Sequence, residues 1–136
     1  LEFDRLIVHY TYPHDPFPLA DPEIRWPFDA LQSGIATRAA VWDAYLDNLR
    51  LVLDEVGRLL ENVDAERVVV TADHGEAFGE YGFYRHMISC PIPCMRNVPW
   101  AETSASDKGT YEPTAPKPGD GIGVYVEDRL EKLGYL

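Results

Sequence analysis

A long amphipathic pattern over residues 37–62 constrains the fold of this chain more than any other feature. Apolar side chains recur there at three- and four-residue spacing, and charged side chains fall mostly on the other side. Thr37 is of the residue type that caps helix N-termini. The pattern predicts one long helix that packs an apolar stripe on a sheet. The stripe consists of Trp42, Tyr45, Leu46, Leu49, Val52, Leu53, Val56, Leu59 and Leu60.

Apolar runs with strand composition flank this helix, at residues 6–10 and 68–72. A strand, a helix and a second strand form a βαβ unit, in which the two strands are parallel and the crossover is right-handed. We therefore expect an α/β fold with three α/β/α layers around a mostly parallel sheet. Ligands bind such sheets outside the carboxyl ends of the strands.

The remaining segments lack a sustained period. Residues 17–35 are rich in proline, aspartate and aromatic residues, and they indicate a lid, a binding loop or a short helix. Residues 101–122 are dominated by small and polar residues and predict a mobile excursion. For residues 123–136 we expect a short helix and tail, with Val126, Leu130 and Leu133 on one stripe.

The charge balance narrows the class of partner. Acidic residues outnumber basic ones 23 to 12, for a formal net charge of −11, which argues against nucleic acid or an anionic membrane as partner. The acidic residues are spread along the chain and only three basic residues are lysines, a pattern that indicates a halophilic protein adapted to high salt. No apolar run approaches the roughly 20 residues of a membrane span, so we expect no membrane segment in this chain.

Two cysteines bear on the cellular compartment. Cys90 and Cys94 are expected to be small buried thiols in a reducing, cytoplasmic environment. A His/Cys/Cys metal site with His86 is the alternative, although two prolines interrupt it. The chain opens at Leu1 and enters the first predicted strand without a leader, which suggests an internal point of a longer polypeptide.

The second predicted strand runs directly into Asp73, His74 and Gly75. Adjacent side chains point to opposite faces of a regular strand, so Asp73 and His74 converge only if the chain turns at Gly75. A carboxylate and an imidazole together suit a divalent cation such as Zn²⁺, Mn²⁺, Mg²⁺ or Ca²⁺. The alternative is an ordinary turn with no ligand role.

Further motifs surround this stretch along the chain. Their order resembles that of the alkaline phosphatase/sulfatase superfamily, specifically its sulfatase-like hydrolases. The motifs are Pro13-His14-Asp15-Pro16, the helical segment from Asp54 to Leu60, Asp73-His74-Gly75-Glu76, the glycine-punctuated loop from Phe78 to His86, Val98-Pro99 and the ending Leu133-Gly134-Tyr135.

The resemblance implies a metal-dependent hydrolase of sulfate or phosphate esters, with residues 1–100 as the C-terminal part of its α/β catalytic domain. Asp73 and His74 match a metal-ligand pair of that family, for Ca, Mg, Mn or Zn. His14 matches a histidine that faces the ester, and His86 matches one that binds a second metal or contacts the transferred group, so both are expected to be catalytic. His14 and Arg85 are expected to bind substrate, with a solvated arginine as the alternative for Arg85.

One departure from the family limits these expectations. The family's nucleophile and its first metal ligands belong to an upstream half of the fold, and neither Cys90 nor Cys94 lies in a Cys-x-Pro-x-Arg context. We therefore expect no nucleophile in this chain, a partial domain that lacks its N-terminal strands, and an incomplete active site. Sulfatase, phosphatase and phosphoglycerol- or phosphoethanolamine-type transferase stay open. Two further alternatives also stay open: a non-catalytic binding or regulatory module, and an unrelated α/β domain.

Overall fold

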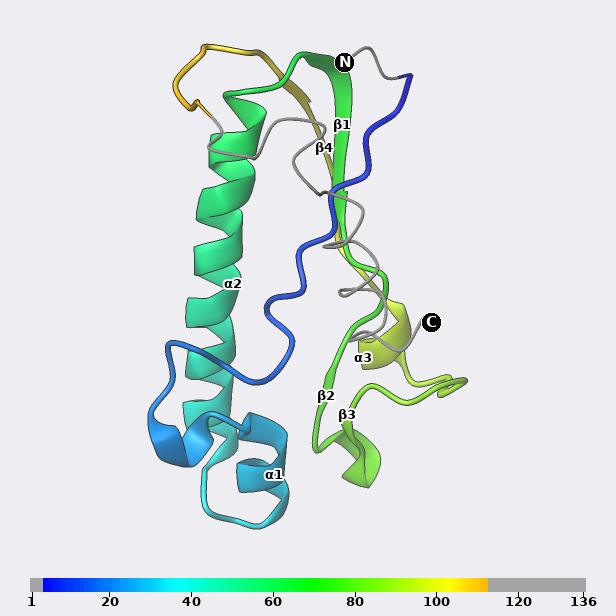
Figure 1. Cartoon of the computed structure of the whole chain (residues 1–136). Helices are drawn as coiled ribbons and strands as arrows, with labels where there is room; N and C mark the ends of the chain where they lie inside the picture. The colour runs from blue at the N-terminus through cyan, green and yellow to red at the C-terminus, as the bar shows by residue number, and fades with distance from the viewer. Residues whose placement is uncertain (1–3, 113–136) are drawn as a thin grey trace, which may run out of the picture.

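The computed structural model describes residues 4–112, which form one long helix, two short antiparallel ladders and several single-turn elements (Figure 1). Helix α2 spans Arg38–Leu60. Thr37 caps it, because its Oγ1 accepts a hydrogen bond from the backbone N–H of Ala40 at 3.2 Å. The predicted long helix is thus confirmed, with Thr37 as its N-cap, and it ends at Leu60, two residues before the predicted end.

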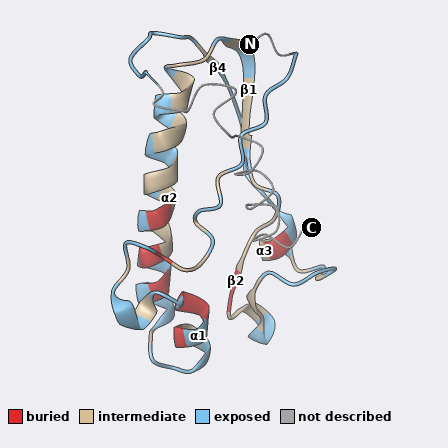
Figure 2. Ribbon diagram, in the orientation of Figure 1, coloured by how far each residue is buried: buried red, intermediate tan, exposed pale blue. Residues whose placement is uncertain are grey.

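The core lies around the first half of α2 (Figure 2). Val41 of this helix packs with Phe28 of helix α1 (Pro27–Gln32) and Phe78 of strand β2 (Ala77–Phe78). Phe28 and Phe78 have ring centroids 5.3 Å apart, a favourable distance for tilted aromatic rings. The cluster fixes α1, α2 and β2 relative to one another.

The sheet prediction is wrong. Strand β1 (Ala65–Thr71) pairs with β4 (Trp100–Ala105) in antiparallel orientation, with Thr71 opposite Trp100, and β2 pairs with β3 (Tyr84–Arg85), also antiparallel. Residues 4–112 contain no parallel pair and no three-layer α/β/α sheet. Residues 6–10, predicted as the first parallel strand, belong to no ladder, and Ile7 is 91% exposed. Without that strand the long helix is not a crossover between parallel strands.

Two further segments differ from or narrow what the sequence predicted. Residues 17–35 contain a 3-10 turn, η1 (Pro22–Ile24), and α1, so the alternative of a short helix is correct there. The mobile segment predicted to begin at residue 101 is ordered at its start. Its first residues belong to β4, which extends to Ala105, and Ala105 pairs with Ala65 of β1. The helix and tail expected at residues 123–136 lie outside the described residues. Of the helices in the described part, none is long and apolar enough to cross a membrane.

Candidate metal centre

The segment between β1 and β2 is held in place by its glycine. The N–H of Gly75 donates a hydrogen bond to the carbonyl of Met95, at 2.9 Å, in helix α3 (Pro93–Arg96). A Cβ atom added to Gly75 would lie 2.0 Å from the carbonyl oxygen of Cys94. Only glycine therefore permits this contact, and the contact fixes the path of the chain on either side, at His74 and Glu76.

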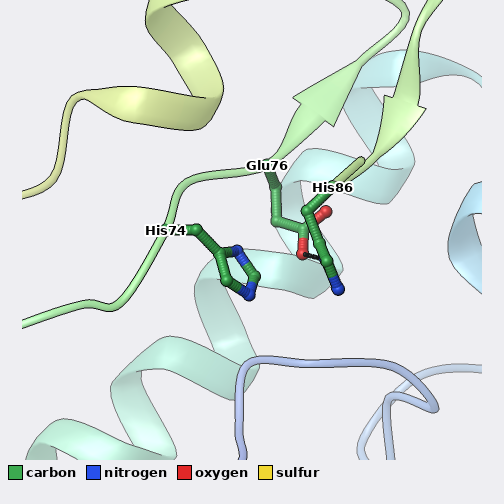
Figure 3. A group of neighbouring side chains, drawn as sticks. All are labelled: His74, Glu76 and His86. Atoms are coloured by element: carbon green, nitrogen blue, oxygen red, sulfur yellow. Dashed lines mark hydrogen bonds and ion pairs between the residues drawn. The ribbon is translucent and has the colours of Figure 1, made fainter. Parts of the chain in front are cut away.

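Three potential metal ligands converge beside this contact: His74, Glu76 and His86 (Figure 3). Their ligand atoms all lie within 4.8 Å of one another. The imidazole rings of His74 and His86 have centroids 4.0 Å apart, and Nδ1 of His86 lies 2.6 Å from Oε1 of Glu76. Two imidazoles and one carboxylate are a donor set that proteins use for zinc and related divalent cations.

The burial of Glu76 tests whether these residues fit a cation. Its side chain is 11% exposed, and its second carboxylate oxygen, Oε2, is buried without a hydrogen-bond partner. A buried carboxylate oxygen without a partner is costly, and a nearby cation offsets that cost. The arrangement is thus compatible with a divalent cation beside Glu76.

The predicted ligands Asp73 and His74 stay side by side, with Oδ2 of Asp73 3.7 Å from Nε2 of His74, but only His74 belongs to the three-residue cluster. Asp73 has a 70% exposed side chain and lies outside the three-residue cluster, where its Oδ1 accepts a hydrogen bond from the backbone N–H of His74 at 3.0 Å. Glu76 takes its place, and the sequence analysis did not assign it as a ligand. The signal was its position two residues after His74, because alternate residues of an extended segment share a side.

His14 borders the cluster from the N-terminal segment. Its ring centroid lies 5.4 Å from that of His86. Its Nδ1 lies 2.6 Å from the backbone carbonyl oxygen of Asp15 and 3.2 Å from Oδ1 of the same residue. The structure thus brings together all three histidines that the sequence singled out for the site.

Arg85 lies behind His14 and pairs with two carboxylates. Its Nη2 atom is 2.8 Å from Oδ2 of Asp29 and 3.3 Å from Oδ2 of Asp15, whose side chain is only 6% exposed. These ion pairs tie β3 to α1 and to the segment that carries His14. The guanidinium predicted to bind substrate thus lies within ion-pair distance of two carboxylates of the protein, although its Nη2 atom makes no hydrogen bond.

An open hollow of about 320 Å³ adjoins His74 and His86. Met87, Met95 and Cys90 make its walls largely apolar, and Arg96 contributes a charge. The cysteines are free thiols, and burial, followed by the nearby charge of Glu80, raises the pKa of Cys94. Among residues 4–112, neither cysteine belongs to a cluster of potential metal ligands, so the predicted alternative of a His/Cys/Cys site has no geometric support there.

Comparisons with protein-family models, curated proteins and solved structures found no match. The likeness to sulfatase-like hydrolases therefore depends on the sequence motifs, and the site must be judged by its own geometry. That geometry places imidazole and carboxylate donors together beside an apolar hollow.

Proposed function

We propose that this chain belongs to a metal-dependent hydrolase of sulfate or phosphate esters and contributes one side of its active site. The observation that carries the proposal is the convergence of His74, Glu76 and His86, with His14 beside them. The sulfatase-like motifs supply the substrate class, since a metal cluster alone does not select an ester.

The histidines have defined tasks in this proposal. A bound divalent cation would polarise the ester oxygens and increase the acidity of an attacking hydroxyl group. His86 is oriented by Glu76, and His14 is oriented by Asp15, so each ring is held in one position. An imidazole held this way is placed to act as a general acid toward a departing alkoxide or phenoxide.

The proposal assigns no nucleophile to this chain. Within residues 4–112, no hydroxyl or thiol is hydrogen-bonded to His14, His74 or His86. An activated nucleophile requires a base within hydrogen-bond reach. We therefore infer that the attacking group comes from another polypeptide segment, and that this chain alone turns over slowly.

The test is hydrolysis of p-nitrophenyl sulfate, p-nitrophenyl phosphate and bis(p-nitrophenyl) phosphate by the 136-residue chain. With Zn²⁺ or Mn²⁺ present, we expect slow release of p-nitrophenol that stops on chelation and in His74→Gln. The matched control is His9→Gln, which replaces an exposed histidine outside the cluster and should leave the rate unchanged.

Two results would contradict parts of the proposal. Equal rates for the wild type, His74→Gln and metal-containing buffer would exclude a hydrolase, and if metal still binds they would favour the second candidate, a non-catalytic metal-binding module. A turnover of about 10 s⁻¹, which is typical of complete enzymes, would contradict the claim that this chain supplies only one side of the site.

A further inference from the structure

The hollow beside the metal centre has a size that suits a small organic ligand. It measures about 320 Å³, near the lower end of the range of about 300–1,000 Å³ that small-molecule sites cover. His74 and His86 belong to its lining, so a ligand in the hollow lies against two of the residues that converge on the metal. The hollow is therefore placed to hold part of a substrate whose reacting bond lies at the metal centre.

One wall of the hollow is a tight turn that exposes apolar side chains. The N–H of Cys90 donates a hydrogen bond to the carbonyl of Met87 at 3.2 Å, which closes the turn. Ile88 lies in this turn and is 99% exposed, and Met87 is 52% exposed. Covering such side chains with an apolar ligand removes their surface from water, which is favourable. The turn therefore favours an apolar group in the hollow.

A second wall is helix α3, which contributes Met95 and Arg96. The carbonyl of Met95 accepts the N–H of Gly75 at 2.9 Å, so this wall is fixed relative to the metal centre. Among residues 4–112, Arg96 forms no ion pair, although acidic residues outnumber basic ones 23 to 12. Arg85, by contrast, lies within ion-pair distance of two carboxylates. The guanidinium of Arg96 is thus the one that the hollow offers to an anion.

We propose that this hollow holds the leaving group of the ester, and that the substrate is an anionic ester with an apolar leaving group about one or two rings in size. Arg96 pairs with the anionic sulfuryl or phosphoryl group, the role that the sequence predicted for Arg85. Met87, Ile88 and Met95 contact the apolar group. The inference rests on the proposed function for the reaction, but binding in the hollow is measured without turnover.

The two methionines of the chain provide a direct readout, because both line the hollow. The experiment labels their methyl groups with ¹³C and titrates the protein with naphthalene-2-sulfonate, an aromatic anion whose C–S bond resists hydrolysis. We expect both methyl signals to shift along one binding curve. Naphthalene-2-sulfonamide, which lacks the charge, should bind about fivefold more weakly. Methanesulfonate, which lacks the rings, should shift neither signal.

Two exposed side chains of the hollow are substituted, each with a matched control. Arg96→Gln should abolish the preference for the sulfonate over the sulfonamide, whereas Arg25→Gln, at an exposed arginine outside the hollow, should keep it. Ile88→Ser should weaken the binding of both compounds by about threefold. Ile7→Ser, at another exposed isoleucine, should leave both affinities unchanged. Because all four side chains are exposed, these substitutions test the hollow and leave the core intact.

The outcomes separate this inference from the proposed function. Naphthalene-2-sulfonate that shifts neither methyl signal, or that binds Arg96→Gln as tightly as the wild type, would overturn the inference. Hydrolysis of the p-nitrophenyl esters without binding in the hollow would refute the hollow alone. Binding without hydrolysis would support the hollow as a site for aromatic anions and would count against the hydrolase.

Discussion

Gly75 approaches Cys94 so closely that a Cβ atom on the glycine would lie 2.0 Å from the carbonyl oxygen of Cys94. No flexible side chain stands at this contact, because the opposing atom belongs to the backbone. The same glycine donates its N–H to Met95. The contact therefore joins α3 to the segment that carries His74 and Glu76, and the geometry of the metal centre depends on it.

We expect Gly75→Ala to lower the free energy of unfolding by at least about 2 kcal/mol and to weaken Zn²⁺ binding, since the backbone must shift. Gly57→Ala is the control. Gly57 lies in α2 with open space around the added Cβ, so alanine should raise stability by about 0.5–1 kcal/mol. Urea unfolding measures both, and similar effects for the two variants would show that the Gly75 contact is absent.

Glu80 makes stability depend on pH. One of its oxygens pairs with Arg38 and the other accepts the N–H of Phe78 at 2.5 Å. Desolvation opposes ionisation, but the hydrogen bonds from the backbone N–H groups of Glu80 and Phe78 and the charge of Arg38 outweigh it and lower the pKa of Glu80. A lowered pKa stabilises the fold above the unfolded value, about 4.3, and this stabilisation is lost as pH falls through the folded value.

Glu80→Gln should therefore be less stable than the wild type at pH 7 and should lose less stability on acidification to pH 3. Urea midpoints at the two pH values measure the difference. The exposed Glu66 of β1 provides a control, and Glu66→Gln should change the midpoint little. Parallel pH curves for the wild type and Glu80→Gln would contradict the role given to these hydrogen bonds.

The acidic surface predicts a dependence on salt. With a formal net charge of −11, the folded chain repels itself, and dense counterions screen that repulsion. We expect the melting temperature to rise between low and multimolar KCl. A flat or falling melting temperature over that range would refute the prediction of a halophilic protein.

The helix could be predicted from sequence, whereas the sheet could not. The apolar period of α2 is local, and Thr37 marks its start, so both are visible in the sequence. Strand pairing is not local. The apolar run at residues 6–10 has strand composition but pairs with no strand in the described part of the chain. Strand β1 instead pairs with Trp100–Ala105, a segment whose serine and threonine suggested a mobile loop.

The site could be predicted only in part, because the sequence motifs are local and the approach of distant side chains is not. The motifs singled out His14, His74 and His86, and in the structure the rings of His14 and His74 both lie near that of His86, although their role in a site stays a prediction. Asp73 was assigned as a ligand because the Asp-His-Gly triplet matches the metal-ligand pair of the sulfatase-like motif, and Glu76 was not assigned. The observed path past Gly75 brings Glu76 to both His74 and His86, whereas Asp73 approaches only His74, at 3.7 Å from its Nε2 atom.

The most direct test of the metal centre is a crystal structure of the zinc-soaked protein, with the metal located by its anomalous scattering. The account predicts one zinc ion at about 2.0–2.2 Å from a ligand atom of each of His74, Glu76 and His86. A zinc ion bound to Asp73, or bound away from these three residues, would contradict it.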